Sequence, residues 1–217
     1  MPPPPDIVAF LQSNASAVFG LLGALGGGVL SFVATSIHKR REFDLLIWGK
    51  LFDRRIAAHE RVVALAIEMR VMVGLGGTDE RGEVRRSPQV LLSREAFDGW
   101  FTRFTQLSME GTTWLTTATK REVNFVQDYL VTLHLHLAEI PSERYLAVGE
   151  IIRQDFVDIS SSLEKQAFEF FRTDIKKLKL NDLQDWHKYK RTETERRLTS
   201  TVLLARLDDV RSLGSKQ

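Results

Sequence analysis

The sequence predicts an all-α protein in which a single N-terminal transmembrane helix is followed by an elongated cytoplasmic helical bundle. An uncharged apolar stretch lies near the N-terminus, and apolar residues recur every three or four positions through the rest of the chain. The alternation typical of β-strands is nowhere sustained. With 217 residues, the chain is long enough for one ordinary domain with an appendage.

The apolar stretch covers residues 17–37 and contains no charged side chain. A helix of that length measures roughly 31 Å, about the thickness of the hydrocarbon core of a bilayer. Consecutive glycines weaken a helix in water, but glycine is commoner in membrane helices than in soluble ones. We therefore expect a membrane span here, and a buried helix of a soluble domain is the alternative.

The first basic side chains, Lys39, Arg40 and Arg41, directly follow the apolar stretch. Basic residues mark the cytoplasmic flank of a span and contact lipid headgroups there. A cleaved signal peptide would need basic residues before the apolar run, and none is present. The expected location is the inner membrane, with these segments: an extracytoplasmic segment over 1–16, a transmembrane helix over 17–37, and a cytoplasmic α-helical domain over 38–217.

Small side chains recur four positions apart within the apolar stretch. This spacing lets two helix backbones approach closely in a membrane. The alternative is that the glycines ease a bend or reflect ordinary membrane-helix composition. We expect a homo-oligomer whose contacts include Gly20, Gly23, Ala24, Gly27 and Gly28.

Beyond the span, the apolar periodicity predicts helices over 42–73, 94–109, 112–139, 143–180 and 183–213. Ser93 and Ser142 are expected to cap two of them. The polar stretch 78–88 is predicted to be an exposed loop, and no sheet is expected.

Composition excludes several classes of protein. The 30 Lys and Arg residues nearly balance 28 Asp and Glu residues, which argues against a strongly basic nucleic-acid coat and against an acidic disordered tail. Cysteine is absent, so disulfides, Cys-ligated metals and thiol nucleophiles are excluded. The histidines lack metal-ligand spacing, and no phosphate-binding loop is present. We expect no metal and no cofactor, and the leading interpretation is not an enzyme.

Arg54 and His59, separated by four residues, form the sharpest chemical motif. The pair resembles the arginine–histidine signature of HEPN ribonucleases, which are all-helical and pair two such motifs across a dimer. The layout is also similar to small membrane-anchored HEPN-like proteins that accompany bacterial antiviral defence. The resemblance implies acid–base catalysis by His59 and stabilisation of phosphorane-like charge by Arg54. A structural or solvated pair is the alternative.

Basic residues gather toward the C-terminus, where residues 172–197 hold nine Lys and Arg against five acids. Trp186 and Tyr189 are interleaved, so RNA phosphates or anionic lipids are candidate partners. An ordinary solvated helix face is the alternative. The candidate contacts are Lys176, Lys177, Lys179, Lys188, Lys190 and Arg191.

The leading hypothesis is a single-pass inner-membrane protein that self-assembles. It would act as a membrane scaffold or as a membrane-perturbing effector of the antiviral-defence kind, which includes pore formation. The lipid bilayer and further copies of the chain are the expected partners. The alternative is a membrane-tethered HEPN-like ribonuclease that uses Arg54 and His59.

Overall fold

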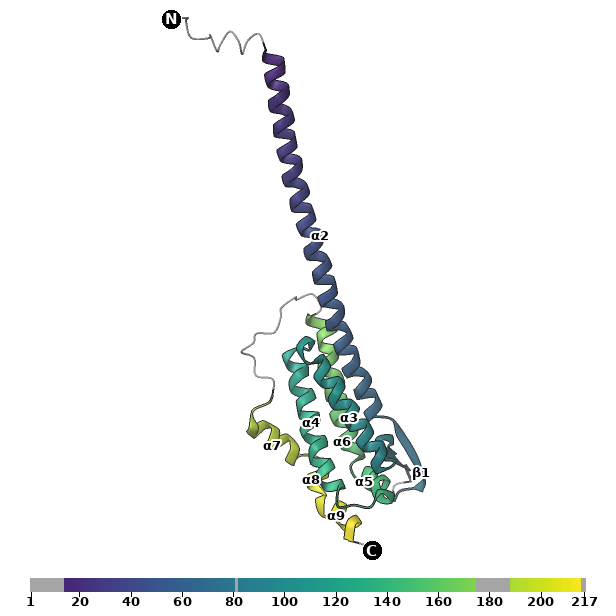
Figure 1. Cartoon of the computed structure of the whole chain (residues 1–217). Helices are drawn as coiled ribbons and strands as arrows, with labels where there is room; N and C mark the ends of the chain where they lie inside the picture. Colours follow the sequence, from purple (N-terminus) through teal and green to yellow (C-terminus); the bar gives the residue numbers. More distant parts are fainter. Residues whose placement is uncertain (1–13, 81, 175–187, 216–217) are drawn as a thin grey trace, which may run out of the picture. The chain divides into compact units, whose positions relative to one another are not determined.

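The computed structural model describes residues 14–80, 82–174 and 188–215, and these are mostly helical with two short strands (Figure 1). The chain divides into two compact units, Met1–Leu51 and Phe52–Gln217. Most of the expected extracytoplasmic segment lies outside the described residues.

Helix α2, Ala15–Met69, is a single helix of 55 residues that contains both the expected span and most of the expected helix over 42–73. In the first unit, the described side chains of the apolar stretch are exposed apart from the half-buried Ser36, and none of the most apolar window is buried. Among the described residues, α2 is the helix that is long and apolar enough to cross a membrane. The sequence therefore correctly predicted a helix of this kind, and the absence of Pro and Gly between residues 50 and 73 correctly indicated that the next helix continues directly from it.

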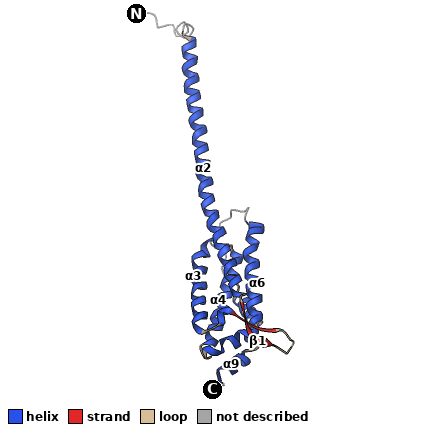
Figure 2. Cartoon of the chain, turned by 90° about the vertical axis from the view of Figure 1, so that its right-hand side faces the viewer, coloured by secondary structure: helices blue, strands red, loops and turns tan. Residues whose placement is uncertain are grey.

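The second unit has one hydrophobic core. Helices α3 (Arg94–Gly111), α4 (Thr117–Leu137) and α6 (Arg153–Glu169) lie side by side in both views (Figures 1 and 2). Their buried faces follow the spacing of apolar residues expected for amphipathic helices. Fully buried side chains include Phe97, Phe104, Tyr129, Leu133 and Phe156.

The starts of two helices show how short polar side chains set helix boundaries. The Ser93 side chain accepts a hydrogen bond from the Ala96 amide, which confirms the expected N-cap of α3. The Thr-rich stretch begins as a 3₁₀ turn, Thr112–Trp114, and α4 starts after Thr116, whose side chain accepts from the Thr119 amide.

The expected helix over 143–180 is interrupted. It comprises a 3₁₀ turn (Ser142–Arg144), α5 (Tyr145–Ile151), α6 and a π-helical turn, Phe170–Asp174. Ile152 leaves helical geometry with φ −97° and ψ 12° between α5 and α6. The apolar periodicity continues through this break, so the sequence has no signal for it. Residues 175–180 lie outside the described part.

The expected helix over 183–213 is also interrupted, into α7 (Arg191–Thr199), α8 (Val202–Ala205) and α9 (Leu207–Ser215). The Thr201 side chain caps α8, and the Asp155 carboxylate accepts hydrogen bonds from the Val202 and Leu203 amides. A carboxylate from a different helix thus satisfies the free amides at the start of α8. Residues 183–187 lie outside the described part.

The described residues from Thr78 to Arg86 are exposed as expected, but Ser87 and Pro88 are buried, and the expectation of a loop over 78–88 without any sheet is wrong. Strands β1 (Met72–Thr78) and β2 (Val84–Pro88) form an antiparallel hairpin, which is red in Figure 2. Gly76 and Gly77 have φ of 75° and 72°, a conformation that glycine adopts without strain, and the register shifts there. Helix α2 ends at Met69, shortly before β1 begins at Met72.

Contacts with α5 position the hairpin. Arg85 donates two hydrogen bonds of 2.6 Å to the Glu150 carboxylate, and Ser87 is buried against Gly149. A Cβ atom on Gly149 would lie 2.1 Å from Ser87 Oγ, so the packing requires glycine. These contacts join residues far apart in sequence, which explains why local polarity misled the prediction.

Candidate functional site

His59 lies in the core of the second unit and exposes none of its surface. Its Nε2 accepts a hydrogen bond from the Thr116 amide at 3.3 Å, and its Nδ1 lies 2.8 Å from the Arg55 carbonyl oxygen. Because Nε2 accepts a hydrogen bond, the hydrogen is assigned to Nδ1, which donates to the carbonyl. The ring also stacks on Phe170 with centroids 3.9 Å apart. Both ring nitrogens are therefore engaged inside the protein.

Arg54 lies in different surroundings, although it is five positions away on the same helix. Its side chain is exposed, and its guanidinium carbon lies 5.5 Å from the centre of the Trp114 ring. The neighbouring Arg55 is buried instead, 5.1 Å from the Phe170 ring. Five positions correspond to about 500° of rotation along an α-helix, which separates the two side chains by about 140°.

Acid–base catalysis requires a proton-exchanging nitrogen within reach of a substrate. The burial and hydrogen bonds of His59 favour a structural role, in which the ring joins α2 to the N-terminus of α4 and to the turn after α6. Within one copy, the structure does not bring Arg54 and His59 together at a common surface.

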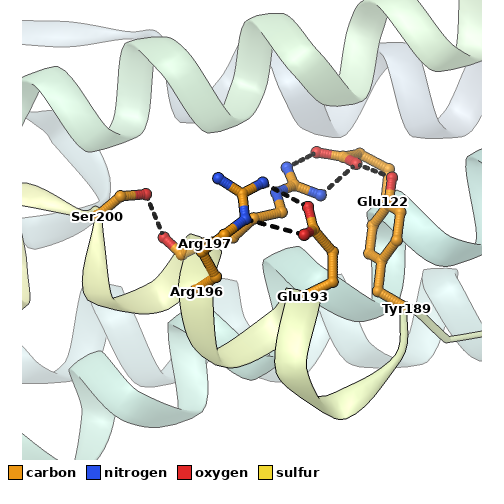
Figure 3. Close-up of polar contacts among 6 residues, drawn as sticks. All are labelled: Glu122, Tyr189, Glu193, Arg196, Arg197 and Ser200. Atoms are coloured by element: carbon orange, nitrogen blue, oxygen red, sulfur yellow. Dashed lines mark hydrogen bonds and ion pairs between the residues drawn. The ribbon is translucent and has the colours of Figure 1, made fainter.

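A second buried polar cluster lies between α4 and α7 (Figure 3). The Glu122 carboxylate accepts two hydrogen bonds from Arg197, at 2.6 and 3.0 Å, and one from the Tyr189 hydroxyl at 2.8 Å. The Arg197 guanidinium also lies 3.7 Å from the centre of the Phe125 ring. The Glu122 side chain is 1% exposed and that of Arg197 is 20% exposed. Arg197 and Tyr189 thus compensate the charge of Glu122 in the interior.

Figure 3 also shows a contrasting exposed pair, in which Arg196 donates to Glu193 on the same helix. This pair stays in water, with side chains 69% and 39% exposed. Such a pair contributes little to stability, whereas a buried charge that loses its partner is costly.

The protonation of this cluster follows from its surroundings. Burial by itself would raise the pKa of Glu122, but hydrogen bonds from Arg197, Tyr189 and Ser162 outweigh burial, so the pKa is lowered from its ordinary value. Burial and the bond to Glu122 raise the pKa of Tyr189 to about 12. Near neutral pH, the tyrosine is therefore a neutral donor and the glutamate an ionised acceptor.

Asp155 binds the start of α8 in the C-terminal segment. Besides the Val202 and Leu203 amides, its carboxylate accepts a hydrogen bond of 3.1 Å from the buried Tyr129 hydroxyl. Burial raises the pKa of Asp155, and these hydrogen bonds offset part of that effect. The sequence analysis did not single out Glu122 or Asp155. Each is one of several acids in its amphipathic helix, so no local signal distinguished it from the solvated charges.

The basic C-terminal candidates are only partly described. Lys176, Lys177 and Lys179 lie outside the described residues. Lys188, Lys190 and Arg191 line a cavity of about 960 Å³ next to α7. The same cavity is also lined by acids, namely Asp128, Glu193 and Glu195, and Arg191 forms an ion pair with Glu195 at 2.7 Å. The described surface is therefore of mixed charge.

The candidate residues of the first unit are all exposed on α2. Each glycine among them has open space where a Cβ would be, and Lys39, Arg40 and Arg41 are exposed. Within the described residues, no group of three or more His, Asp or Glu side chains is placed to hold a metal ion.

Comparison with known proteins identifies no relative. No protein-family model matches the chain, and neither a curated protein nor a solved structure matches it significantly. The class that the fold supports is a mostly helical protein in which, over residues 14–80, 82–174 and 188–215, one helix is long and apolar enough to cross a membrane.

Proposed function

We propose that the chain is a single-pass membrane protein that self-assembles through its N-terminal helix. Its activity would lie in that assembly, as a membrane scaffold or as a membrane-perturbing effector. The observation that carries this proposal is the exposure of the apolar part of α2, where Leu25 and Phe32 expose 60% and 73% of their surface. Bulky apolar side chains at such density require a lipid or protein environment.

Small residues on one side of the helix support self-assembly. At 100° per residue, Gly20, Gly23, Ala24, Gly27 and Gly28 lie within about 140° of one another, while Leu22, Val29 and Val33 lie on the opposite side. Close backbone approach on the small side supplies van der Waals contact where no hydrophobic drive exists between helices.

The orientation in the proposal is N-terminus outside and second unit in the cytoplasm, which the basic residues after the span support. Because the chain has no cysteine, single cysteines report accessibility without background. A cysteine replacing Ser13 should react with an impermeant maleimide in intact cells, and one replacing the exposed Glu80 should react only after lysis. The reverse pattern would reject the orientation. A cysteine at Ser87, in the same hairpin region, would not report accessibility because that position is buried.

Assembly is tested by the mass of the detergent-solubilised particle. Gly23→Leu with Gly27→Leu adds bulk to the small side while keeping the segment apolar, so insertion should persist and the particle should become smaller. Val29→Leu with Ser36→Leu adds bulk on the opposite side and should leave the mass unchanged. An unchanged mass for the first pair would show that these glycines do not mediate assembly.

A further inference from the structure

Apolar side chains remain exposed on α2 after the expected span ends. Leu45 and Leu46 expose 70% and 57% of their surface, although they follow three basic residues and two acids. At 1.5 Å per residue, Leu45 lies about 12 Å beyond Ile37, the last residue of the span. The headgroup layer on one side of a bilayer is about 5–8 Å thick. If α2 stands upright in the bilayer, lipid tails cannot cover these two leucines.

The position of these leucines on the helix suggests what covers them. Eighteen residues correspond to five turns of 3.6 residues, so residues 18 apart lie on the same side of a helix. Leu45 therefore lies on the same line along α2 as Gly27, and Leu46 lies on the same line as Gly28, about 100° away. By the same relation, Arg41 follows Gly23 and Glu42 follows Ala24. We call Arg41, Glu42, Leu45 and Leu46 the flanking face.

The flanking face carries charges of opposite sign, so it is electrostatically complementary to the same face of a second copy. Arg41 and Glu42 lie on opposite sides of the line through Leu45, at about 40° and 60° from it. Two parallel helices related by a two-fold axis place the left side of one against the right side of the other. Each Arg41 would then meet the Glu42 of the other copy, and both side chains are exposed in a single copy. His38, which lies 3.2 Å from Glu42 on the same helix, is compatible with this arrangement.

We propose that the flanking face binds the same face of a second copy, so that the interface between copies extends from the span past the basic residues. Leu45 is buried between the helices and two Arg41–Glu42 ion pairs flank it, while Leu46, about 100° from Leu45, lies at the edge of the interface beyond Glu42. This inference rests on the proposed self-assembly, and it names the surface used outside the membrane. The pairing of charges fixes a parallel arrangement in register, because a shift or reversal would separate them.

Cysteine cross-linking in native membranes tests the inference. Leu45→Cys places a thiol on the flanking face, and Ile47→Cys places one on the opposite side of the same helix, about 200° away. With mild oxidant, the full-length Leu45→Cys protein should form disulfide-linked dimers at least about fivefold more than Ile47→Cys, because a disulfide needs Cα atoms within about 7 Å. Equal yields at both positions would overturn the inference.

Charge exchange in the Leu45→Cys background tests the ion pairs. Arg41→Glu and Glu42→Arg should each lower the cross-linked fraction about threefold, since each places like charges together. The double exchange restores complementarity and should restore the cross-linked fraction. Failure of the double exchange to restore it would overturn the charge pairing.

The particle mass separates failure of this inference from failure of the proposed function. A monomeric solubilised particle from the unmodified protein would overturn self-assembly itself. An oligomeric particle without preferential cross-linking at residue 45 would overturn only the flanking face, and would mean that lipid headgroups or other parts of the chain cover it.

Discussion

In the first unit, Leu25 and Phe32 expose 60% and 73% of their surface, whereas in the second unit Leu133 and Phe97 expose none. The residue types are the same, and both pairs lie on helices. The second unit covers its apolar side chains with its own helices, while the described part of the first unit, residues 14–51, is one helix with no other element around it. Its apolar surface therefore requires an environment that the chain itself does not supply.

Charges show the same contrast. In the second unit Glu122 is buried and satisfied by Arg197 and Tyr189. In the first unit Lys39, Arg40 and Arg41 stay exposed at the end of the apolar stretch. The second unit thus depends on internal complementarity, and its variants should change stability. Variants of the first unit should instead change insertion or assembly.

The largest effect on stability is expected at the buried ion pair. Glu122→Gln should lower the free energy of unfolding by about 4 kcal/mol, because Arg197 would lose its charged partner in the interior. Glu193→Gln breaks the exposed pair with Arg196 and should leave the unfolding midpoint unchanged. Urea unfolding of the solubilised protein, followed by tryptophan fluorescence, measures both. Equal effects would mean that Glu122 is solvated in solution.

The same cluster predicts a dependence on pH. The pKa of Glu122 is lower in the folded protein than its ordinary value of 4.5, so its contribution is complete above that value and is lost as the pH falls below it. Unfolding free energies measured from pH 6 to 3 should therefore fall more steeply for the unmodified protein than for Glu122→Gln. Parallel curves would contradict the lowered pKa.

Matched leucine truncations test the contrast between units directly. Leu133→Ala should cost about 3 kcal/mol of unfolding free energy, because it leaves a cavity in a fully buried site. Leu25→Ala removes the same atoms from an exposed site and should leave the unfolding of the second unit unchanged. A comparable loss for Leu25→Ala would show that the two units are energetically coupled.

His59→Phe tests the structural role of the histidine. Phenylalanine keeps the ring stacked on Phe170 but leaves the Thr116 amide without its acceptor, so we expect a loss of about 2 kcal/mol. Arg54→Ala, at an exposed position, should leave the unfolding midpoint close to that of the unmodified protein. If both variants instead retain stability and abolish a ribonuclease activity, the catalytic alternative would be correct.

The smallest effects are expected at two helical glycines of the second unit. Gly149→Ala should cost about 1–2 kcal/mol, because its Cβ would collide with Ser87 Oγ and approach Leu91 and Pro88 at 3.1 Å. Gly99→Ala meets nothing within 4 Å and should stabilise the protein by about 0.5–1 kcal/mol. Thermal unfolding of both variants measures the difference. A stabilising Gly149→Ala would mean that β2 does not pack on α5 as described.

Sequence by itself determined the features that depend on neighbours along the chain. The helical character, the long apolar N-terminal helix and the Ser93 cap follow from periodicity, from the absence of charge and from a side chain that bonds three residues ahead. For the candidate site residues, the sequence showed the motif but not the surroundings of each side chain. The motif of Arg54 and His59 was visible in the sequence, but only the packing of Thr116 and Phe170 against His59 revealed that the ring is buried.

Tertiary structure alone decided the hairpin, the breaks at Ile152 and Thr201, and the roles of Glu122 and Asp155. For the hairpin, Glu122 and Asp155, the stabilising partner lies far away in sequence: Glu150 for the hairpin, Arg197 for Glu122, and the Val202 amide for Asp155. A local pattern reports which face of an element is apolar, but it cannot report which distant group will satisfy a buried charge or end a helix. That choice depends on which surfaces the folded chain brings together, because a buried polar group is stable only where a partner meets it.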